Sequence, residues 1–138
     1  MAHAAVGAII MSARTGRVML NLRSDSVTYS NYWGFVGGKI EDGEEVEIAL
    51  HREIFEELGI LLPVNVPKYQ IDIFTTRNQK FNYYSYLVIV PEEFVPVLNS
   101  ESKGYSWVEF GSWPKPLHPG AKSTLTNEDI IKKIQDLK

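Results

Sequence analysis

The sequence predicts an α/β fold in which a mixed β-sheet packs against helices. Two observations predict it. Six short segments are rich in apolar, β-branched or aromatic residues, as buried and half-buried strands are. One long amphipathic segment divides them into two groups of three, and a second amphipathic segment lies near the end of the chain. The resulting order, β-β-β-α-β-β-β-α, is typical of a sheet covered by helices.

The first three strands precede the long amphipathic segment. Ala5 to Met11 is almost continuously apolar, which predicts a strand buried on both faces. Arg17 to Leu22 alternates and is expected to form a hairpin with it through a turn at Arg14 to Gly16. Arg23 ends the second strand beside a polar loop. Tyr32 to Val36 is predicted to be a brief aromatic strand.

The long helix has start and stop signals. Asp42 is predicted as its N-cap, with Glu45 as the capping-box partner three residues later. The helix is expected to run to about Leu58, where Gly59 is suited to the C′ position.

The second half of the chain repeats the strand pattern. Tyr69 to Thr76 and Phe81 to Val90 are expected to pair as a hairpin, and Gly104 to Phe110 to add another strand. A proline-rich bend follows, and Asn127 or Thr126 is expected to cap the last helix. No repeat or linker divides residues 1–138, which we expect to form a single domain.

Composition excludes several classes of protein. The formal net charge of −3 gives no reason to expect stable nucleic-acid or membrane binding. There is no cysteine, and therefore no disulfide, thiol nucleophile or cysteine zinc site. No signal peptide or membrane-spanning run is recognised, so a cytoplasmic location is expected. The sequence leaves a homodimer open.

The long helix carries three glutamates on its apolar side. With Val46 at zero and about 100° per residue, the apolar stripe extends from about −60° to about +80°. On the same count Glu53 falls at about −20°, Glu57 at about +20° and Glu56, at the edge of the stripe, at about −80°. These carboxylates are therefore predicted to point toward the core, which a solvated acidic helix face would not do.

Such a cluster needs a counter-charge. Two carboxylates about 5 Å apart repel by roughly 3 kcal/mol at an effective dielectric of about 20. The cluster must be partly protonated, splayed into water or neutralised by a cation. Oxygen ligands without cysteine or a positioned histidine favour Mg²⁺ or Mn²⁺, and Mg²⁺ bound in this way usually bridges to phosphates. Gly37 and Gly38 would permit close backbone approach, and Arg52 can brace one carboxylate.

These residues resemble the box of the Nudix hydrolase family, G-x(5)-E-x(7)-R-E-U-x-E-E-x-G-U with U a bulky aliphatic residue. The sequence matches every specified position: Gly38, Glu44, Arg52, Glu53, Ile54, Glu56, Glu57, Gly59 and Ile60. The flanking WGFVGGKIEDGE and the weaker GYSWVEF and PLHPG stretches extend the resemblance along the chain. The resemblance implies an α/β/α sandwich that hydrolyses nucleoside diphosphates linked to another moiety.

The resemblance also implies roles for the box residues. Glu53, Glu56 and Glu57 would bind the metal, aided by a backbone carbonyl of a turn at Gly37 and Gly38. Arg52 would orient Glu53. Glu44 would hold the loop in place or support the metal through water.

The general base and the substrate contacts are less closely specified by the sequence. The general base would be a box glutamate, foremost Glu53, or Glu101 from a later loop. Glu101 fits an exposed surface position equally well. Arg23 resembles a phosphate-contacting arginine. Phe35 could flank a base or pack in the core, as could Tyr32 and Trp33, and Lys39 is a further candidate for substrate binding. The three histidines, His118 among them, are expected to have surface or packing roles.

The leading functional hypothesis is metal-dependent hydrolysis of a (d)NTP to NMP and pyrophosphate. Hydrolysis of another nucleoside diphosphate derivative, such as ADP-ribose, a dinucleoside polyphosphate or a nucleotide sugar, is the alternative. A non-catalytic nucleotide-binding module is disfavoured because all the box glutamates are present. Isoprenyl diphosphate isomerases use a catalytic cysteine that this chain lacks.

Overall fold

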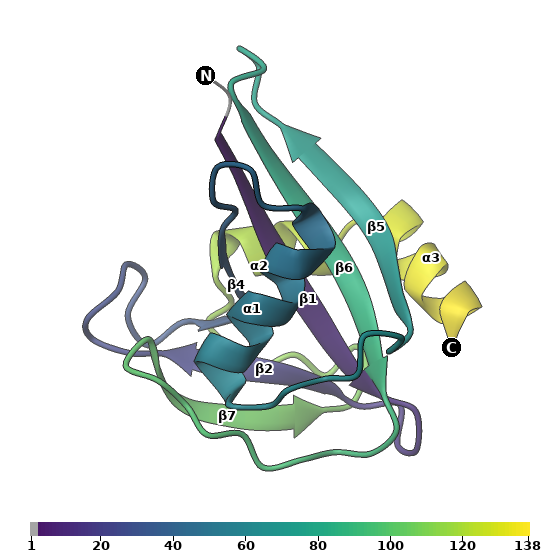
Figure 1. Ribbon diagram of the computed structural model, residues 1–138. Coiled ribbons are helices and arrows are strands. Elements are labelled where there is room, and N and C mark those ends of the chain that lie inside the picture. The colour runs from purple at the N-terminus through teal and green to yellow at the C-terminus, as the bar shows by residue number, and fades with distance from the viewer. Residues whose placement is uncertain (1–2) are drawn as a thin grey trace.

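The computed structural model describes residues 3–138 and shows a mixed sheet with helices on both sides (Figure 1). In chain order the elements are β1 His3–Ser12, β2 Val18–Arg23, β3 Trp33–Gly34, β4 Val36–Lys39, α1 Val46–Leu58, β5 Lys68–Thr75, β6 Phe81–Val90, β7 Ser102–Val108, α2 Pro119–Leu125 and α3 Glu128–Leu137.

Strand β1 is the centre of the sheet. The main path runs β3-β2-β1-β6-β5, with β4 antiparallel to β1 and β7 antiparallel to β2. β1 and β6 pair in parallel along their whole length, and the chain between them carries α1. A parallel pair needs such a crossover. The mixed sheet predicted from the sequence is confirmed.

Each face of the sheet has its own hydrophobic core, because side chains alternate along β1. Val6, Ala8 and Ile10 pack in a cluster that contains the apolar side of α1. Ile9 and Met11 pack in a second cluster with Ile130 and Ile134 of α3. The two clusters make the protein an α/β/α sandwich.

The start of α1 differs from the prediction, whereas its end does not. Asp42 is not the N-cap. Glu45 occupies that position in an extended conformation and makes no side-chain cap bond. The loop before the helix is held instead by Glu44, whose carboxylate accepts the Glu41 N–H at 3.0 Å. Gly59 adopts the left-handed conformation with φ of 68°, as expected for a C-terminal glycine.

The glycine pair lies in a strand and not in the predicted turn. The expected strand Tyr32 to Val36 is divided at Phe35 into β3, which pairs with β2, and β4, which pairs with β1. Gly37 and Gly38 are therefore paired with Gly7 and Val6 of β1. Because neither glycine has a side chain, β4 can pack closely against β1 and against helix α1.

Helix α2 was not predicted, because the three prolines in the preceding WPKPLHPG segment indicated a bend. Pro119 stands in the first turn of the helix, where its missing N–H is not needed. The His118 side chain caps the helix by accepting the Gly120 N–H at 3.0 Å. Asn127 caps α3 as expected, accepting the N–H groups of Asp129 and Ile130.

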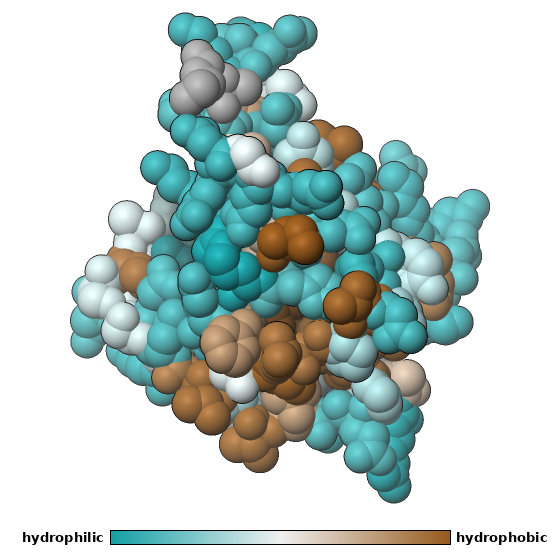
Figure 2. Space-filling view, viewed as in Figure 1, coloured by the Kyte–Doolittle hydropathy of each residue, from teal (hydrophilic) through white to brown (hydrophobic). Residues whose placement is uncertain are grey.

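The surface is mostly hydrophilic, with apolar side chains gathered in the lower part of the view in Figure 2. Large apolar residues that are exposed in the loops after α1 and β6 are Leu61, Val64, Val95 and Val97. Over the described part of the chain, every helix is too short or too polar to cross a bilayer.

Candidate active site

Helix α1 presents two glutamates to the interior. Glu53 and Glu57 are 8% and 6% exposed and belong to the buried side of the helix. Glu56, at the edge of that side, has a side chain that is 50% exposed. The orientation predicted from the helical periodicity is therefore confirmed, including the peripheral position of Glu56.

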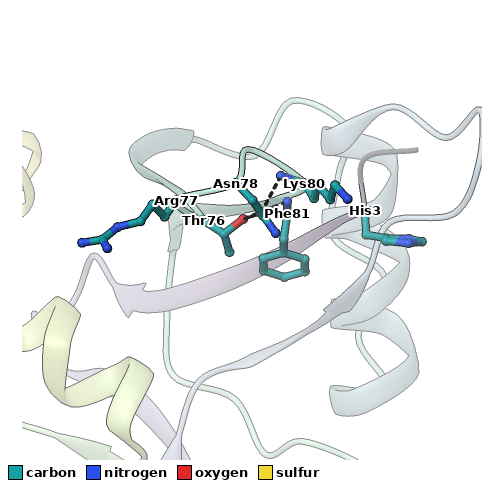
Figure 3. Close-up of a pocket in the computed structure, with 6 residues that line it drawn as sticks. All are labelled: His3, Thr76, Arg77, Asn78, Lys80 and Phe81. Atoms are coloured by element: carbon teal, nitrogen blue, oxygen red, sulfur yellow. Dashed lines mark hydrogen bonds between the residues drawn. The ribbon is translucent and has the colours of Figure 1, made fainter.

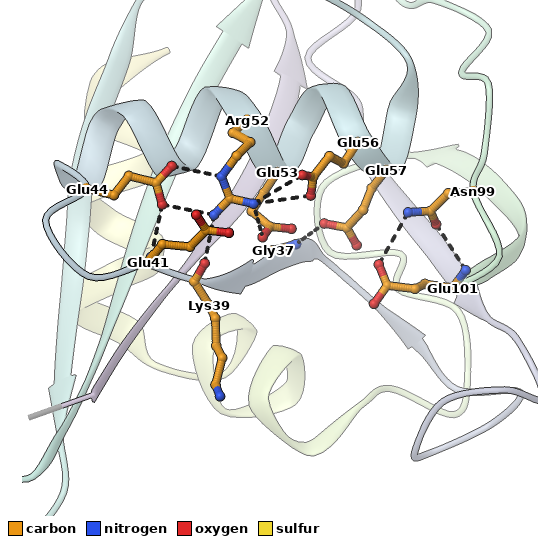
Figure 4. Close-up of polar contacts among 10 residues, drawn as sticks. All are labelled: Gly37, Lys39, Glu41, Glu44, Arg52, Glu53, Glu56, Glu57, Asn99 and Glu101. Carbon is orange, nitrogen blue, oxygen red and sulfur yellow. Dashed lines mark hydrogen bonds and ion pairs between the residues drawn. The ribbon is translucent and has the colours of Figure 1, made fainter.

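Arg52 is the centre of a network that joins the helix to the preceding loop (Figure 4). Its Nε and Nη2 donate to the two carboxylate oxygens of Glu44 at 2.8 and 2.9 Å. Its Nη1 donates to Glu53 at 3.0 Å and to Glu56 at 3.2 Å, and Nη2 also donates to the Lys39 carbonyl at 2.9 Å. Hydrogen bonds from Arg52 hold the pKa of Glu44 below its ordinary value.

The two glycines of β4 allow the buried carboxylates to approach the sheet. The Gly37 N–H donates to Glu57 Oε2 at 2.9 Å. A Cβ on Gly38 would lie 2.5 Å from the Glu53 carboxyl group, and a Cβ on Gly37 would collide with the Val6 carbonyl. No other residue fits either position without movement of the backbone or the carboxylate.

The buried carboxyl groups favour protonation in the metal-free protein. Burial raises the pKa of Glu57 to about 9, and the nearby Glu101 and Glu53 carboxylates add to the effect. Burial also raises the pKa of Glu53, although the Arg52 charge opposes it. A bound proton thus neutralises part of the carboxylate charge that was expected to need a counter-charge.

The donor set fits an open Mg²⁺ or Mn²⁺ site better than a closed one. Among residues 3–138, no group of three or more His, Cys, Asp or Glu side chains is placed to hold a metal ion. Arg52 lies between Glu53 and Glu56 and binds both. Mg²⁺ does not need an all-protein cage, since it keeps several waters and commonly uses one or two carboxylates plus substrate phosphates. Buried carboxylates that hold a proton would release it when such a cation binds.

Glu101 lies beside the acidic helix, although it is far from it in sequence. It immediately precedes β7, and its carboxylate accepts the Asn99 side-chain N–H at 3.3 Å (Figure 4). Glu101 and Glu57 line the same small cavity of about 60 Å³, together with Arg23 and Gly37. The structure thus brings the two candidate regions for a general base together.

A larger cavity of about 620 Å³ lies between the sheet and α2. Four of the predicted substrate-binding residues line it: Arg23, Phe35, Gly37 and Gly38. Lys39 does not. Its carbonyl binds Arg52, while its side chain extends away from the carboxylates in Figure 4. The Arg23 guanidinium folds onto its own loop, where Nε donates to the Thr28 carbonyl at 2.7 Å.

Several residues that line this cavity were not identified from the sequence. Asp72 and Ser85 come from β5 and β6, and His118 comes from the start of α2. Burial, and then the Arg23 charge, keep the pKa of His118 below its ordinary value. The strand register could have revealed Ser85 and Asp72, but no single-sequence signal reports register.

Tyr83 lines this cavity and lies against Gly7 of β1. Its hydroxyl lies where a Cβ of Gly7 would otherwise stand. Burial raises the pKa of Tyr83 to about 12, with a further contribution from Glu57.

A separate hollow of about 690 Å³ lies at the turn between β5 and β6 (Figure 3). It is lined by His3, Thr76, Arg77, Asn78, Lys80 and Phe81. Asn78 Oδ1 accepts bonds from Thr76 at 2.7 Å and from the Lys80 N–H at 3.1 Å, which organise the turn itself. None of the box residues reaches it.

Comparisons with known proteins agree with this site. A family model for the NUDIX domain matches residues 1–127. An RNA pyrophosphohydrolase from Wolbachia sp. subsp. Drosophila simulans (strain wRi) is 32% identical over 89 residues, which are 64% of this chain and 45% of that protein. This chain therefore matches less than half the length of that relative. Nucleoside triphosphatase NudI from Escherichia coli O139:H28 is 30% identical over 102 residues, which are 67% of this chain and 72% of NudI.

The fold also matches solved structures. The Nudix hydrolase RenU from M. smegmatis superposes with a TM-score of 0.76 at 21% identity, over 98% of this chain and 86% of that one. Fold and acidic site together define an α/β/α sandwich whose long helix buries two carboxylates against the sheet. Because the family model covers most of the sequence, the chain belongs to the Nudix family.

Proposed function

We propose that this Nudix hydrolase cleaves a nucleoside triphosphate to the nucleoside monophosphate and pyrophosphate, and that it requires Mg²⁺ or Mn²⁺. One observation carries the proposal. The buried carboxylates and the large cavity between the sheet and α2 meet at the glycines of β4, since Gly37 binds Glu57 and also lines the cavity. A nucleoside in the cavity would therefore extend its phosphates toward the acidic helix.

The box glutamates are the metal ligands in this proposal. Glu53, Glu56 and Glu57, with the Gly38 carbonyl, would hold the cation, which polarises phosphoryl oxygens and offsets their charge. Arg52 orients Glu53 through its bond at 3.0 Å and is itself fixed by the two bonds to Glu44. Arg23 would contact a phosphate after leaving its loop carbonyl.

Glu53 is our first candidate for the general base, and Glu101 is the alternative. Glu53 is buried against β4 and its orientation is fixed by Arg52. Glu101 lines the small cavity together with Glu57. A base must reach the attacking water. Glu101 lines the small cavity with Gly37, and Glu53 lies against Gly38, which lines the large cavity.

The two relatives favour different substrates. NudI is named a nucleoside triphosphatase, which agrees with a triphosphate substrate. The RNA pyrophosphohydrolase favours a second candidate substrate, the phosphorylated end of an RNA. The formal charge of −3 disfavours the second candidate, because extended phosphate backbones bind basic surfaces.

The test is incubation with a panel of nucleoside triphosphates, ADP-ribose and 5′-triphosphorylated RNA, with Mg²⁺, with Mn²⁺ or with chelator. We expect NMP and pyrophosphate from at least one triphosphate, and only with metal. Glu53→Gln should lower turnover at least 100-fold, whereas the matched change Glu47→Gln, on the exposed side of the same helix, should not. Absence of hydrolysis across the panel would refute the proposal.

A further inference from the structure

The floor of the large cavity between the sheet and α2 is a row of paired residues across four strands. Gly37 of β4 pairs with Gly7 of β1, Gly7 pairs with Ser85 of β6, and Ser85 pairs with Asp72 of β5. All four residues line the cavity. At about 4.8 Å per strand, the row extends about 14 Å from the glycine that binds Glu57 to the Asp72 carboxylate.

A β-bulge gives Asp72 its position. The register of β5 shifts between Gln70 and Asp72, so that Ile71 is an extra residue. Ile71 is 1% exposed and packs in the α3 cluster, while Asp72, next to it, lines the cavity on the same face. Without the bulge, alternation would place these neighbours on opposite faces. Bulges of this kind commonly reorient side chains next to active sites.

The shape of the cavity suits a planar ring. Along the row the side chains are glycine, glycine and serine, so the floor is low except over Gly7, where the Tyr83 hydroxyl lies. Tyr83 and Phe74, which pair across β6 and β5, lie on one side of it, and Phe35 lies on the other. Helix α2 covers the cavity with small residues that include Ala121 and Thr124. Aromatic walls beside a row of small side chains are favourable for a nucleobase.

The charges give the cavity a direction. Of the residues that line it, Arg23 bears the positive charge and Asp72 the single carboxylate. Triphosphate is repelled by Asp72 and attracted by Arg23, which lines the small cavity together with Gly37 and Glu57. The base of a bound nucleotide is therefore expected at the Asp72 end of the row.

We propose that this end of the cavity recognises guanine, with the two Asp72 oxygens accepting hydrogen bonds from N1–H and the N2 amino group. This inference rests on the proposed function, because it names the base of its substrate. A carboxylate only accepts hydrogen bonds. Guanine presents two adjacent donors on one edge, which satisfy both oxygens. Adenine and cytosine place an acceptor beside their amino group, and uracil and thymine place N3–H between two carbonyls.

Hypoxanthine provides the sharpest test, because it is guanine without the N2 amino group. We expect wild-type protein to turn over GTP with a kcat/KM about 10- to 100-fold above that of ITP. Asp72→Asn should bring this ratio close to one, because the amide has one acceptor oxygen. Asp136→Asn, the same change at an exposed position on α3, should leave the ratio unaltered.

Equilibrium binding of GMP and IMP separates this inference from the proposed function, because it requires no turnover. Tighter binding of GMP than of IMP, lost in Asp72→Asn, supports guanine recognition even if no triphosphate is hydrolysed. Hydrolysis with equal kcat/KM for GTP and ITP would overturn guanine recognition and leave the pyrophosphohydrolase function intact. Retention of the GTP preference in Asp72→Asn would also overturn it. The comparison of ligands remains decisive if the variant does not fold.

Discussion

Gly38 and Glu53 occupy the same space: a Cβ on the glycine would lie 2.5 Å from the carboxyl carbon and from Oε1 of the glutamate. The two residues come from β4 and α1, so the carboxylate can rest against the sheet only because the strand has no side chain there. The glycine therefore determines the position of the glutamate.

Gly38→Ala should displace the Glu53 carboxylate and lower kcat/KM at least 100-fold, because the metal-binding and catalytic geometry depends on that position. Gly104→Ala is the matched control: its Cβ would lie 3.7 Å from Leu22, an ordinary contact. Steady-state kinetics and circular-dichroism melting of both variants measure the effect. Near wild-type kcat/KM in Gly38→Ala would show that Glu53 can act from another position.

Arg52→Lys should retain the positive charge and still lower kcat by about 10- to 100-fold. Lysine cannot donate to both Glu44 oxygens, to Glu53 and to the Lys39 carbonyl from one rigid plane. The loss of these bonds should also destabilise the fold by about 1–3 kcal/mol. Arg14→Lys, at an exposed ion pair with Glu92, is the control. Kinetics and urea denaturation of both variants test this. If Arg52→Lys behaves like Arg14→Lys, the guanidinium geometry is not needed.

The helix and the orientation of its acidic side chains could be predicted because they depend on local spacing. The orientation of Glu53 and Glu57 follows from about 3.6 residues per turn, and the structure confirms it. The prediction that Asp42 is the N-cap was wrong. The loop before α1 is held instead by the bond between Glu44 and Arg52, which is a tertiary contact. Sequence patterns propose local caps, but long-range bonds can override them.

The cavity could not be predicted because it depends on strand register. Gly7, Ser85 and Asp72 are distant in sequence and meet only through the parallel pairing of β1 with β6 and the bulge in β5. Helix α2, which covers them, was not predicted because three nearby prolines indicated a bend. The residues proposed to hold the metal thus lie in one stretch of sequence, from Gly38 to Glu57, whereas those proposed to select the base do not.

The stability of the metal-free protein should fall as pH rises from about 5 to 9. Burial raises the pKa of Glu57 from 4.5 to about 9, so between these values the folded state binds a proton that the unfolded state has released. Its stabilising effect is complete below pH 4.5 and is lost as pH approaches 9. The slope from this group is at most about 1.4 kcal/mol per pH unit.

Urea denaturation in chelator at several pH values measures this slope, and Glu57→Gln should reduce it because glutamine does not titrate. Glu47→Gln should not, since that side chain is exposed on the same helix. Equal slopes in Glu57→Gln and wild type would contradict the raised pKa.

Gly7 and Tyr83 should be energetically coupled. The Tyr83 hydroxyl lies where a Cβ of Gly7 would stand, and its ring carbon Cζ would be 2.9 Å from that Cβ. Gly7→Ala should therefore destabilise the protein and move the tyrosine. Tyr83→Phe removes the closest atom but keeps the ring, so the double variant should recover part of the lost stability.

A double-mutant cycle by urea denaturation gives the coupling, which we expect to exceed about 0.5 kcal/mol, because residues in direct contact deviate from additivity by that amount or more. Gly104→Ala combined with Tyr83→Phe should be additive, since Gly104 contacts Leu22. Because Tyr83 also lines the cavity, Gly7→Ala should raise the KM of the substrate, and Tyr83→Phe should partly restore it. Additive free energies in the Gly7 cycle would show that Tyr83 moves aside freely and does not fix the wall of the cavity.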